Sequence, residues 1–223
     1  MGLHESDAPI GPDIATPDLA TVLRAIEGAP RGDDWHAVRP LVIPALPRHR
    51  SEPPGAPPPL RRTLPPGIAV GFAADIGPAF MMMTAAQCES LGISEDDLVA
   101  QSLANLIARA ERVVPGDVIR EQNGEAPIAA LQTGLAIASA LVLVPDQVAR
   151  LFGPTPAILA APMRDLLLAL PADVDPELAA WWFDVFASQD PNHLPPILYR
   201  FDGRAIVPFA VGAQPSSARR LDA

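Results

Sequence analysis

The sequence predicts a single α+β domain in which an antiparallel or mixed sheet is built from hairpins and helices pack on it. Helical and strand-like segments alternate irregularly along the 223 residues, which argues against a doubly wound parallel sheet. Several apolar runs are separated only by short turns, and this spacing favours hairpins. Apolar residues make up 49% of the chain, so the domain has enough of them to form a core.

The predicted domain occupies residues 16–210. Residues 1–15 lack periodicity and 211–223 form a polar tail, so both ends are predicted to be disordered. Residues 44–66 contain nine prolines, and four arginines stand there against one acid, Glu52. Because proline cannot donate a backbone hydrogen bond, this segment is predicted to be solvent exposed and to lack regular structure.

Capping residues mark the predicted helix starts in the first half of the chain. Thr16 is the predicted N-cap of a helix that ends at Gly28. Its apolar stripe consists of Leu19, Val22, Leu23 and Ile26. Thr84 forms a predicted capping box with Gln87, and Ser94 caps a longer helix whose first turn is acidic. The apolar face of that helix is predicted to contain Val99, Leu103, Leu106, Ile107 and Ala110.

The last predicted helix has the clearest pattern. Asp175 is its N-cap and Pro176 its first residue. Its apolar stripe consists of Leu178, Trp181, Trp182, Val185 and Phe186. This helical spacing predicts that both tryptophans pack against the sheet rather than stack on a ligand.

Predicted strands fill most of the remaining chain. They cover residues 38–43, 67–75, 79–83, 128–133, 136–144, 157–161, 166–170, 197–201 and 205–209. Pro40 makes the first an edge strand or a bulge. Residues 128–133 and 136–144 are predicted to form a buried pair, and 162–165 the turn of a hairpin. Residues 115–126 are predicted to be a loop, and a short helix is predicted from Pro145 to Gly153.

The composition excludes several classes of enzyme. The chain contains no lysine, so a P-loop, a protein kinase and a Schiff-base enzyme lack their essential residue. Cys88 is the single cysteine and lies in an apolar helical pattern, which predicts a packed thiol and excludes an intrachain disulfide. The four histidines lack metal-ligand spacing, and no dinucleotide-binding or nucleophile-elbow motif occurs. No cofactor and no metal are therefore predicted.

The net charge of −10 disfavours nucleic acid and an anionic membrane surface as partners, because both require a basic face. The longest apolar stretch, residues 135–144, is half of the roughly 20 residues that span a bilayer. The N-terminus lacks the basic start and apolar run of a secretory signal. A cytoplasmic protein is therefore predicted, with an unknown protein partner or self-association.

The candidate site residues are Arg164, Asp165 and His193. A guanidinium, a carboxylate and an imidazole are able to form a small acid–base site. They are equally able to form a structural clasp. On the second interpretation Asp165 accepts backbone N–H bonds across its own turn, and Arg164 reaches residues 189–193 near the end of the last helix.

Four ordered segments resemble the YtpQ-like family of uncharacterised bacterial proteins, a domain of unknown function. The segment APMRDLLL at 161–168 is similar to its P-x-R-D-x-L signature. Residues 82–105, 139–145 and 190–203 resemble its strand-helix-helix pattern, its S-x-L-L-L-P step and its D-G ending. The resemblance implies a cytoplasmic bacterial protein of this fold and carries no activity.

Three functional interpretations follow. The absence of a catalytic motif favours a non-catalytic binding or regulatory module. An enzyme of unassigned class would use Asp165, Arg164 and His193. A third class of protein would display residues 44–66 as a proline-rich docking segment for an aromatic groove.

Overall fold

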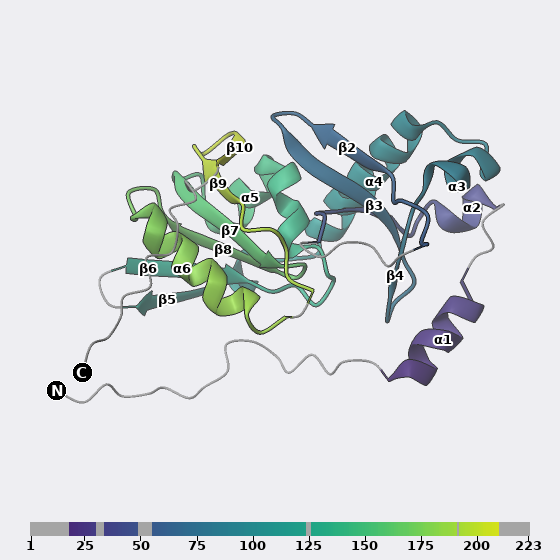
Figure 1. The fold of residues 1–223 in the computed structure, drawn as a ribbon. Helices are drawn as coiled ribbons and strands as arrows, with labels where there is room; N and C mark the ends of the chain where they lie inside the picture. Colours follow the sequence, from purple (N-terminus) through teal and green to yellow (C-terminus); the bar gives the residue numbers. More distant parts are fainter. Residues whose placement is uncertain (1–17, 30–33, 49–54, 124–125, 191, 210–223) are drawn as a thin grey trace.

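The computed structural model describes residues 18–29, 34–48, 55–123, 126–190 and 192–209, and these form two antiparallel sheets with helices around them (Figure 1). The α+β fold class is confirmed. The tails predicted at 1–15 and 211–223 lie outside the described residues.

The first sheet has four strands in the order β1-β3-β2, and β4 also pairs with β3. The strands are β1 (Val42–Ala45), β2 (Arg61–Leu64), β3 (Ile68–Asp75) and β4 (Phe80–Met82). The helices beside them are α2 (Trp35–Val38), α3 (Ala85–Ser90) and α4 (Glu95–Ala110). Strand β3 is central because it is almost continuously apolar and buried. The strands predicted at 67–75 and 79–83 are confirmed.

The prediction for residues 44–66 is wrong in part. Strand β2 lies inside this segment and pairs with β3 over four residues, and Leu46 and Leu60 are buried. Arg61–Leu64 contains no proline, so its N–H groups are available to the sheet. Pro44 lies in β1, where it is opposite Phe72. Both β1 and β2 are edge strands, which is where a sheet tolerates nearby proline.

The second sheet has six strands in the order β10-β9-β7-β8-β6-β5. They are β5 (Ile119–Asn123), β6 (Ala126–Leu131), β7 (Ala157–Met163), β8 (Leu166–Pro171), β9 (Leu198–Phe201) and β10 (Ile206–Phe209). The β7–β8 and β9–β10 hairpins are confirmed. The β7–β8 turn is shorter than the predicted turn at 162–165, since Met163 pairs with Leu166 and only Arg164 and Asp165 lie between them. The loop predicted at 115–126 contains a short 3₁₀ helix, η1 (Pro115–Asp117), and strand β5.

The strand predicted at 136–144 is wrong, because this run forms a 3₁₀ helix, η2 (Ala138–Leu143). Gly134 and Ala136 both have positive φ angles, which break an extended chain. Helix η2 contacts β1 as well as β7 and β8, so it lies between the sheets and its apolar side chains are buried there. The helix predicted next is confirmed as α5 (Pro145–Phe152).

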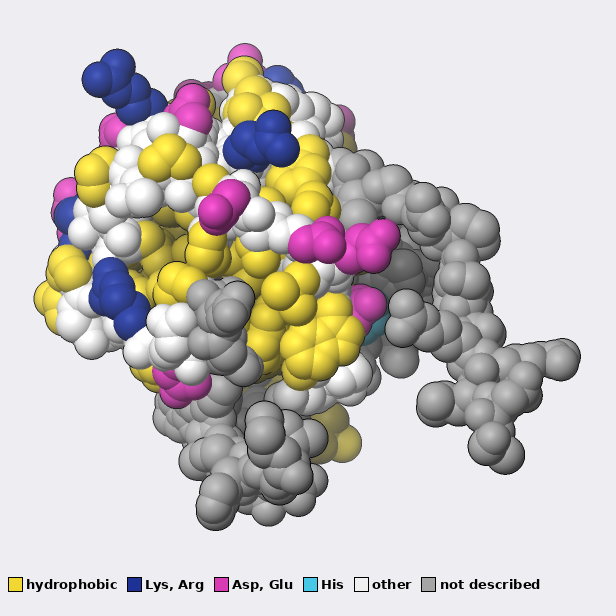
Figure 2. Space-filling view, turned by 90° about the vertical axis from the view of Figure 1, so that its left-hand side faces the viewer, with side chains coloured by type: hydrophobic (Ala, Val, Ile, Leu, Met, Phe, Trp, Pro, Cys, Tyr) yellow, Lys and Arg dark blue, Asp and Glu magenta, His cyan; other side chains and the backbone are white. Residues whose placement is uncertain are grey.

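The caps predicted for α6 (Pro176–Ala187) are confirmed, and its fully buried face shares only Phe186 with the predicted one. The buried residues are Ala179, Phe183, Phe186 and Ala187. Trp181 is 53% exposed, so its predicted packing against the sheet is wrong, whereas Trp182 is half-buried and packs against the core between α6 and the second sheet, as predicted. Because Ala179 and Ala187 are part of it, the buried stripe of α6 is displaced around the helix by one residue from the predicted stripe. Figure 2 shows hydrophobic side chains gathered on the end of the molecule where β5, β6 and α6 lie.

Helix α1 (Leu19–Glu27) starts at Asp18, whose side chain accepts from Thr21 N–H, rather than at Thr16. Its predicted stripe exists but contains no buried residue. The capping box at Thr84 and the N-cap at Ser94 are confirmed, and Ser94 also forms a capping box with Asp97. The strand predicted at 38–43 begins only at Val42, because α2 occupies the chain up to Val38.

The buried face of α4 is also rotated from the predicted one. It contains Leu98, Ser102, Leu106 and Ala110, whereas Ile107 is exposed. Among the helices of the described ranges, none is both long and apolar enough to cross a membrane.

Candidate ligand-binding site

The β7–β8 turn places Arg164 and Asp165 side by side, and their side chains contact different partners. Within the described residues, neither of them hydrogen-bonds to His193. The imidazole Nδ1 of His193 lies 3.0 Å from the carbonyl oxygen of Leu194, ahead of β9. The Leu194 N–H donates to the Pro162 carbonyl at 2.9 Å, which brings the segment of His193 to the end of β7, but the described residues do not form a hydrogen-bonded triad of the three candidates.

Asp165 holds the segment between β6 and η2. Its Oδ1 accepts from the Thr133 hydroxyl and from the N–H groups of Ile137 (3.2 Å) and Ala138 (3.3 Å). Its Oδ2 accepts from the Gly134 N–H at 2.6 Å. Asp165 thus accepts backbone N–H bonds as predicted, but from a distant segment rather than across its own turn. Both carboxylate oxygens are occupied in fixing this segment.

Arg164 points toward the first sheet. Its guanidinium carbon lies 4.1 Å from the centroid of the Phe80 ring, a cation–π contact. Its Nη1 is buried and has no hydrogen-bond partner within the described residues. The carboxylate of Asp190 attracts the Arg164 guanidinium, so the predicted approach to 189–193 is present as a charge interaction, without a hydrogen bond to the described residues of that segment. Burial, followed by the like charge of Arg48, lowers the pKa of Arg164 to about 10. Arg164 therefore carries a positive charge at neutral pH with an unused buried donor.

A small cavity of about 90 Å³ lies beside this guanidinium. Arg48, which follows β1, and Arg61, the first residue of β2, line it together with Arg164. The Arg48 Nη1 donates to Asn192 Oδ1 at 3.4 Å. Phe80 forms a further wall. Three arginines from both sheets thus meet around one small space.

A second cavity, of about 340 Å³, shares Arg48 and Arg61 with the first. The rest of its lining is backbone and apolar or aromatic side chains, including Ile68, Leu194 and Tyr199. Burial raises the pKa of the Tyr199 hydroxyl to about 12, so it stays protonated at neutral pH.

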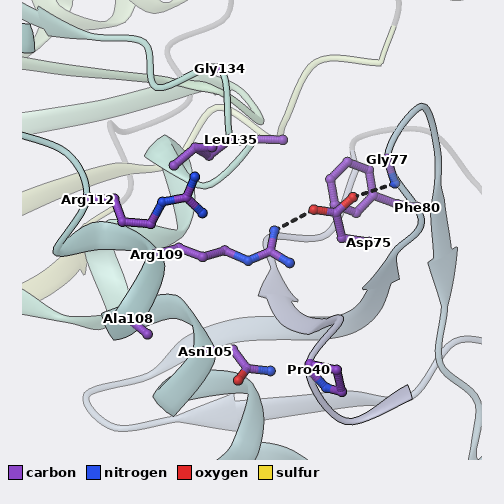
Figure 3. Close-up of a pocket in the computed structure, with 11 residues that line it drawn as sticks. Pro40, Asp75, Gly77, Phe80, Asn105, Ala108, Arg109, Arg112, Gly134 and Leu135 are labelled. Carbon is purple, nitrogen blue, oxygen red and sulfur yellow. Dashed lines mark hydrogen bonds and ion pairs between the residues drawn. The ribbon is translucent and has the colours of Figure 1, made fainter. Parts of the chain in front are cut away.

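A third cavity, of about 540 Å³, shares Phe80 with the first (Figure 3). Arg109 and Arg112 extend into it from the end of α4, and Arg109 forms an ion pair with Asp75. Asp75 also accepts from the Gly77 N–H at 2.9 Å. The Asp165-bound segment supplies the opposite wall through Gly134, Leu135 and Ala136.

We call these three adjoining cavities the arginine groove. Five arginines line it, and Asp75 is the single acidic residue in its described lining. The arginines are Arg48, Arg61, Arg109, Arg112 and Arg164. The whole chain has a net charge of −10, so this is a local reversal of sign. A cleft of one sign concentrates ligands of the opposite charge.

Sequence reasoning selected Arg164 and missed the other groove residues. The excess of arginine in 44–66 was the signal for Arg48 and Arg61, but it was interpreted as a property of an extended exposed segment. Phe80, Arg109 and Tyr199 lie in ordinary strand and helix patterns. Only the packing of the two sheets brings them to Arg164.

Other candidate chemistry is limited in the described residues. No group of three or more His, Cys, Asp or Glu side chains is placed there to hold a metal ion. Cys88 is buried in the core beside β3, and this burial raises the pKa of its thiol. Comparisons of the chain with protein-family models, curated proteins and solved structures find no match. The resemblance to the YtpQ-like family thus stays a prediction.

Proposed function

We propose that this protein is a non-catalytic binding module that holds an acidic ligand in the arginine groove. The observation that carries the proposal is the buried Nη1 of Arg164, which has no acceptor within the described residues. A buried charged donor without a partner costs more than about 1–3 kcal/mol. A ligand anion would supply the missing acceptor and offset that cost.

The neighbours of Arg164 support an anion rather than a neutral ligand. Arg48 contributes a like charge that disfavours the empty state, and the charges of Asp190 and Asp75 offset part of this repulsion. A guanidinium presents a planar fork of donors that matches a carboxylate or a phosphate. The carboxylates of Asp190 and Asp75 attract the Arg164 guanidinium from a distance, but among the described residues neither accepts a hydrogen bond from its buried Nη1, which is still without an acceptor.

The same contacts favour binding over catalysis. Asp165 accepts three hydrogen bonds at Oδ1 and one at Oδ2 from the 133–138 segment, so this carboxylate is committed to holding that segment rather than placed as a general base. The enzyme interpretation with Asp165, Arg164 and His193 therefore has less support. The docking-segment interpretation is also weakened, because β2 is built into the first sheet. A cytoplasmic location and YtpQ-like membership remain predictions of the sequence.

The test is thermal unfolding in chloride, in inorganic phosphate and in citrate at constant ionic strength. An anion that binds only the folded state stabilises it by about 2.7 kcal/mol at one hundred times its Kd. We expect phosphate or citrate to raise the Tm of wild type and to leave that of Arg164→Met unchanged.

The matched control is Arg204→Met, which removes an exposed arginine in the β9–β10 turn. We expect this variant to respond to the anions as wild type does. An equal response of Arg164→Met and wild type, or no response of wild type to either anion, would overturn the proposal.

A further inference from the structure

We infer that the acidic ligand is a small carboxylic acid with an apolar tail. Its carboxylate binds between Arg164 and Arg48, and its tail lies in the adjoining cavity beside Tyr199. This inference rests on the proposed function and adds the class of ligand.

The sizes of the two cavities set the shape of the ligand. The space beside Arg164 is about 90 Å³ and the adjoining space is about 340 Å³. Since a water occupies roughly 30 Å³ of liquid volume, the first space fits a carboxylate and little more. The two cavities share Leu46, Pro47, Arg48 and Arg61, so one ligand is able to occupy both.

The residues that line the larger cavity indicate that the tail of the ligand is apolar. Ile68, Leu194 and Tyr199 are each at most 3% exposed, and they belong to the same core cluster. The described lining has no acidic residue, and its two arginines lie in the wall shared with the head cavity. A second anionic group placed deep in this space would lose water and gain no partner there. An apolar tail loses no hydrogen bond and gains contact with the lining.

The cavity on the other side of Phe80 is a poorer place for the tail. It is lined by Asp75, Asn105, Arg109 and Arg112, so its walls are polar and charged. The inferred ligand therefore runs from Arg164 toward β9 rather than toward α4.

The experiment measures binding of acetate, butyrate, hexanoate and octanoate to the full chain by calorimetry at constant ionic strength. Burial of each methylene is expected to tighten Kd by about fourfold until the cavity is filled. Hexanamide has the same tail without the charge, and we expect it to bind more than tenfold more weakly than hexanoate.

Two variants locate the tail. Ala69 lines the apolar cavity and is exposed, so Ala69→Phe adds bulk there with little risk to folding. We expect it to abolish the dependence on tail length while acetate and phosphate still bind. Ala100→Phe adds the same bulk at an exposed position of α4 outside the groove, and should bind the acids as wild type does.

The outcomes separate the two proposals. If phosphate and acetate bind through Arg164 but tail length adds nothing, the acidic-ligand function stands and the apolar-tail inference is wrong. If Arg164→Met or Ala69→Phe keeps the full dependence on tail length, the acids bind elsewhere and the inference is also wrong. If no anion binds wild type, both proposals fail.

Discussion

The guanidinium of Arg164 lies over the ring of Phe80, with 4.1 Å between the guanidinium carbon and the ring centroid. Arg164 belongs to the β7–β8 turn of the six-stranded sheet, and Phe80 begins β4 of the four-stranded sheet. The contact therefore joins the two sheets where two of the groove cavities adjoin. In this position Nη1 of Arg164 is buried and unpaired within the described residues, and an unpaired buried donor lowers the stability of the fold.

Arg164→Met should not destabilise the protein in chloride buffer. The substitution loses a cation–π contact worth about 0.5–2 kcal/mol. It also removes a buried donor without a partner, whose cost is of similar or greater size. We expect a free energy of unfolding between that of wild type and about 2 kcal/mol above it, measured by urea denaturation. A loss of more than about 1 kcal/mol would indicate that the guanidinium is satisfied in the folded state.

Substitution of the neighbouring residue, Asp165, should lower the stability of the fold. Asp165→Ala leaves the four donors of the 133–138 segment without their acceptor, and we expect a loss of about 3 kcal/mol. Asp165→Asn keeps one acceptor oxygen, so it should lose about half as much. Thermal midpoints of both variants beside wild type test this order. Unchanged midpoints for both would remove the structural role and favour the catalytic interpretation.

Two aromatic residues of α6 should differ sharply in their contribution to stability. Phe183 is 2% exposed in the core between α6 and the second sheet, whereas Trp181 is 53% exposed. Phe183→Ala should cost about 3–5 kcal/mol, because it leaves a cavity beneath the helix. Trp181→Ala should cost less than about 1 kcal/mol, since it empties no core space. Similar losses in urea denaturation would contradict the observed orientation of α6.

The fold was predictable where one residue type has one strong local preference. Thr84, Ser94 and Asp175 cap helices as predicted, and Asp202-Gly203 joins β9 to β10. An apolar run has no such single preference, because strands and buried helices both contain one. The strand predicted at 136–144 is a 3₁₀ helix over Ala138–Leu143, because a distant carboxylate, Asp165, binds the N–H groups at its start.

The candidate site was predictable only in part for the same reason. Arg164 stood out because it interrupts two apolar strands. Its role depends on Phe80, Arg48 and Tyr199, which come from three other parts of the chain. The prolines of 44–66 concealed β2, since four proline-free residues at a sheet edge give a weak local signal. Long-range packing of the two sheets, which no local pattern encodes, creates the groove.

Tyr199 is the single tyrosine of the chain, so its ionisation is observable without interference from another phenol. Burial raises its pKa from 10.0 to about 12 in the folded protein. The folded state therefore keeps the proton that the unfolded state releases, and stability falls as the pH rises from 10 toward 12. The phenolate absorbance of native protein should titrate near 12, and that of protein in denaturant near 10. The Tyr199→Phe variant should lack this contribution, of order 2–3 kcal/mol, to the fall in the free energy of unfolding at alkaline pH. A native titration near 10 would show instead that water reaches the hydroxyl freely, and the cavity beside β9 would then be too wet for an apolar tail.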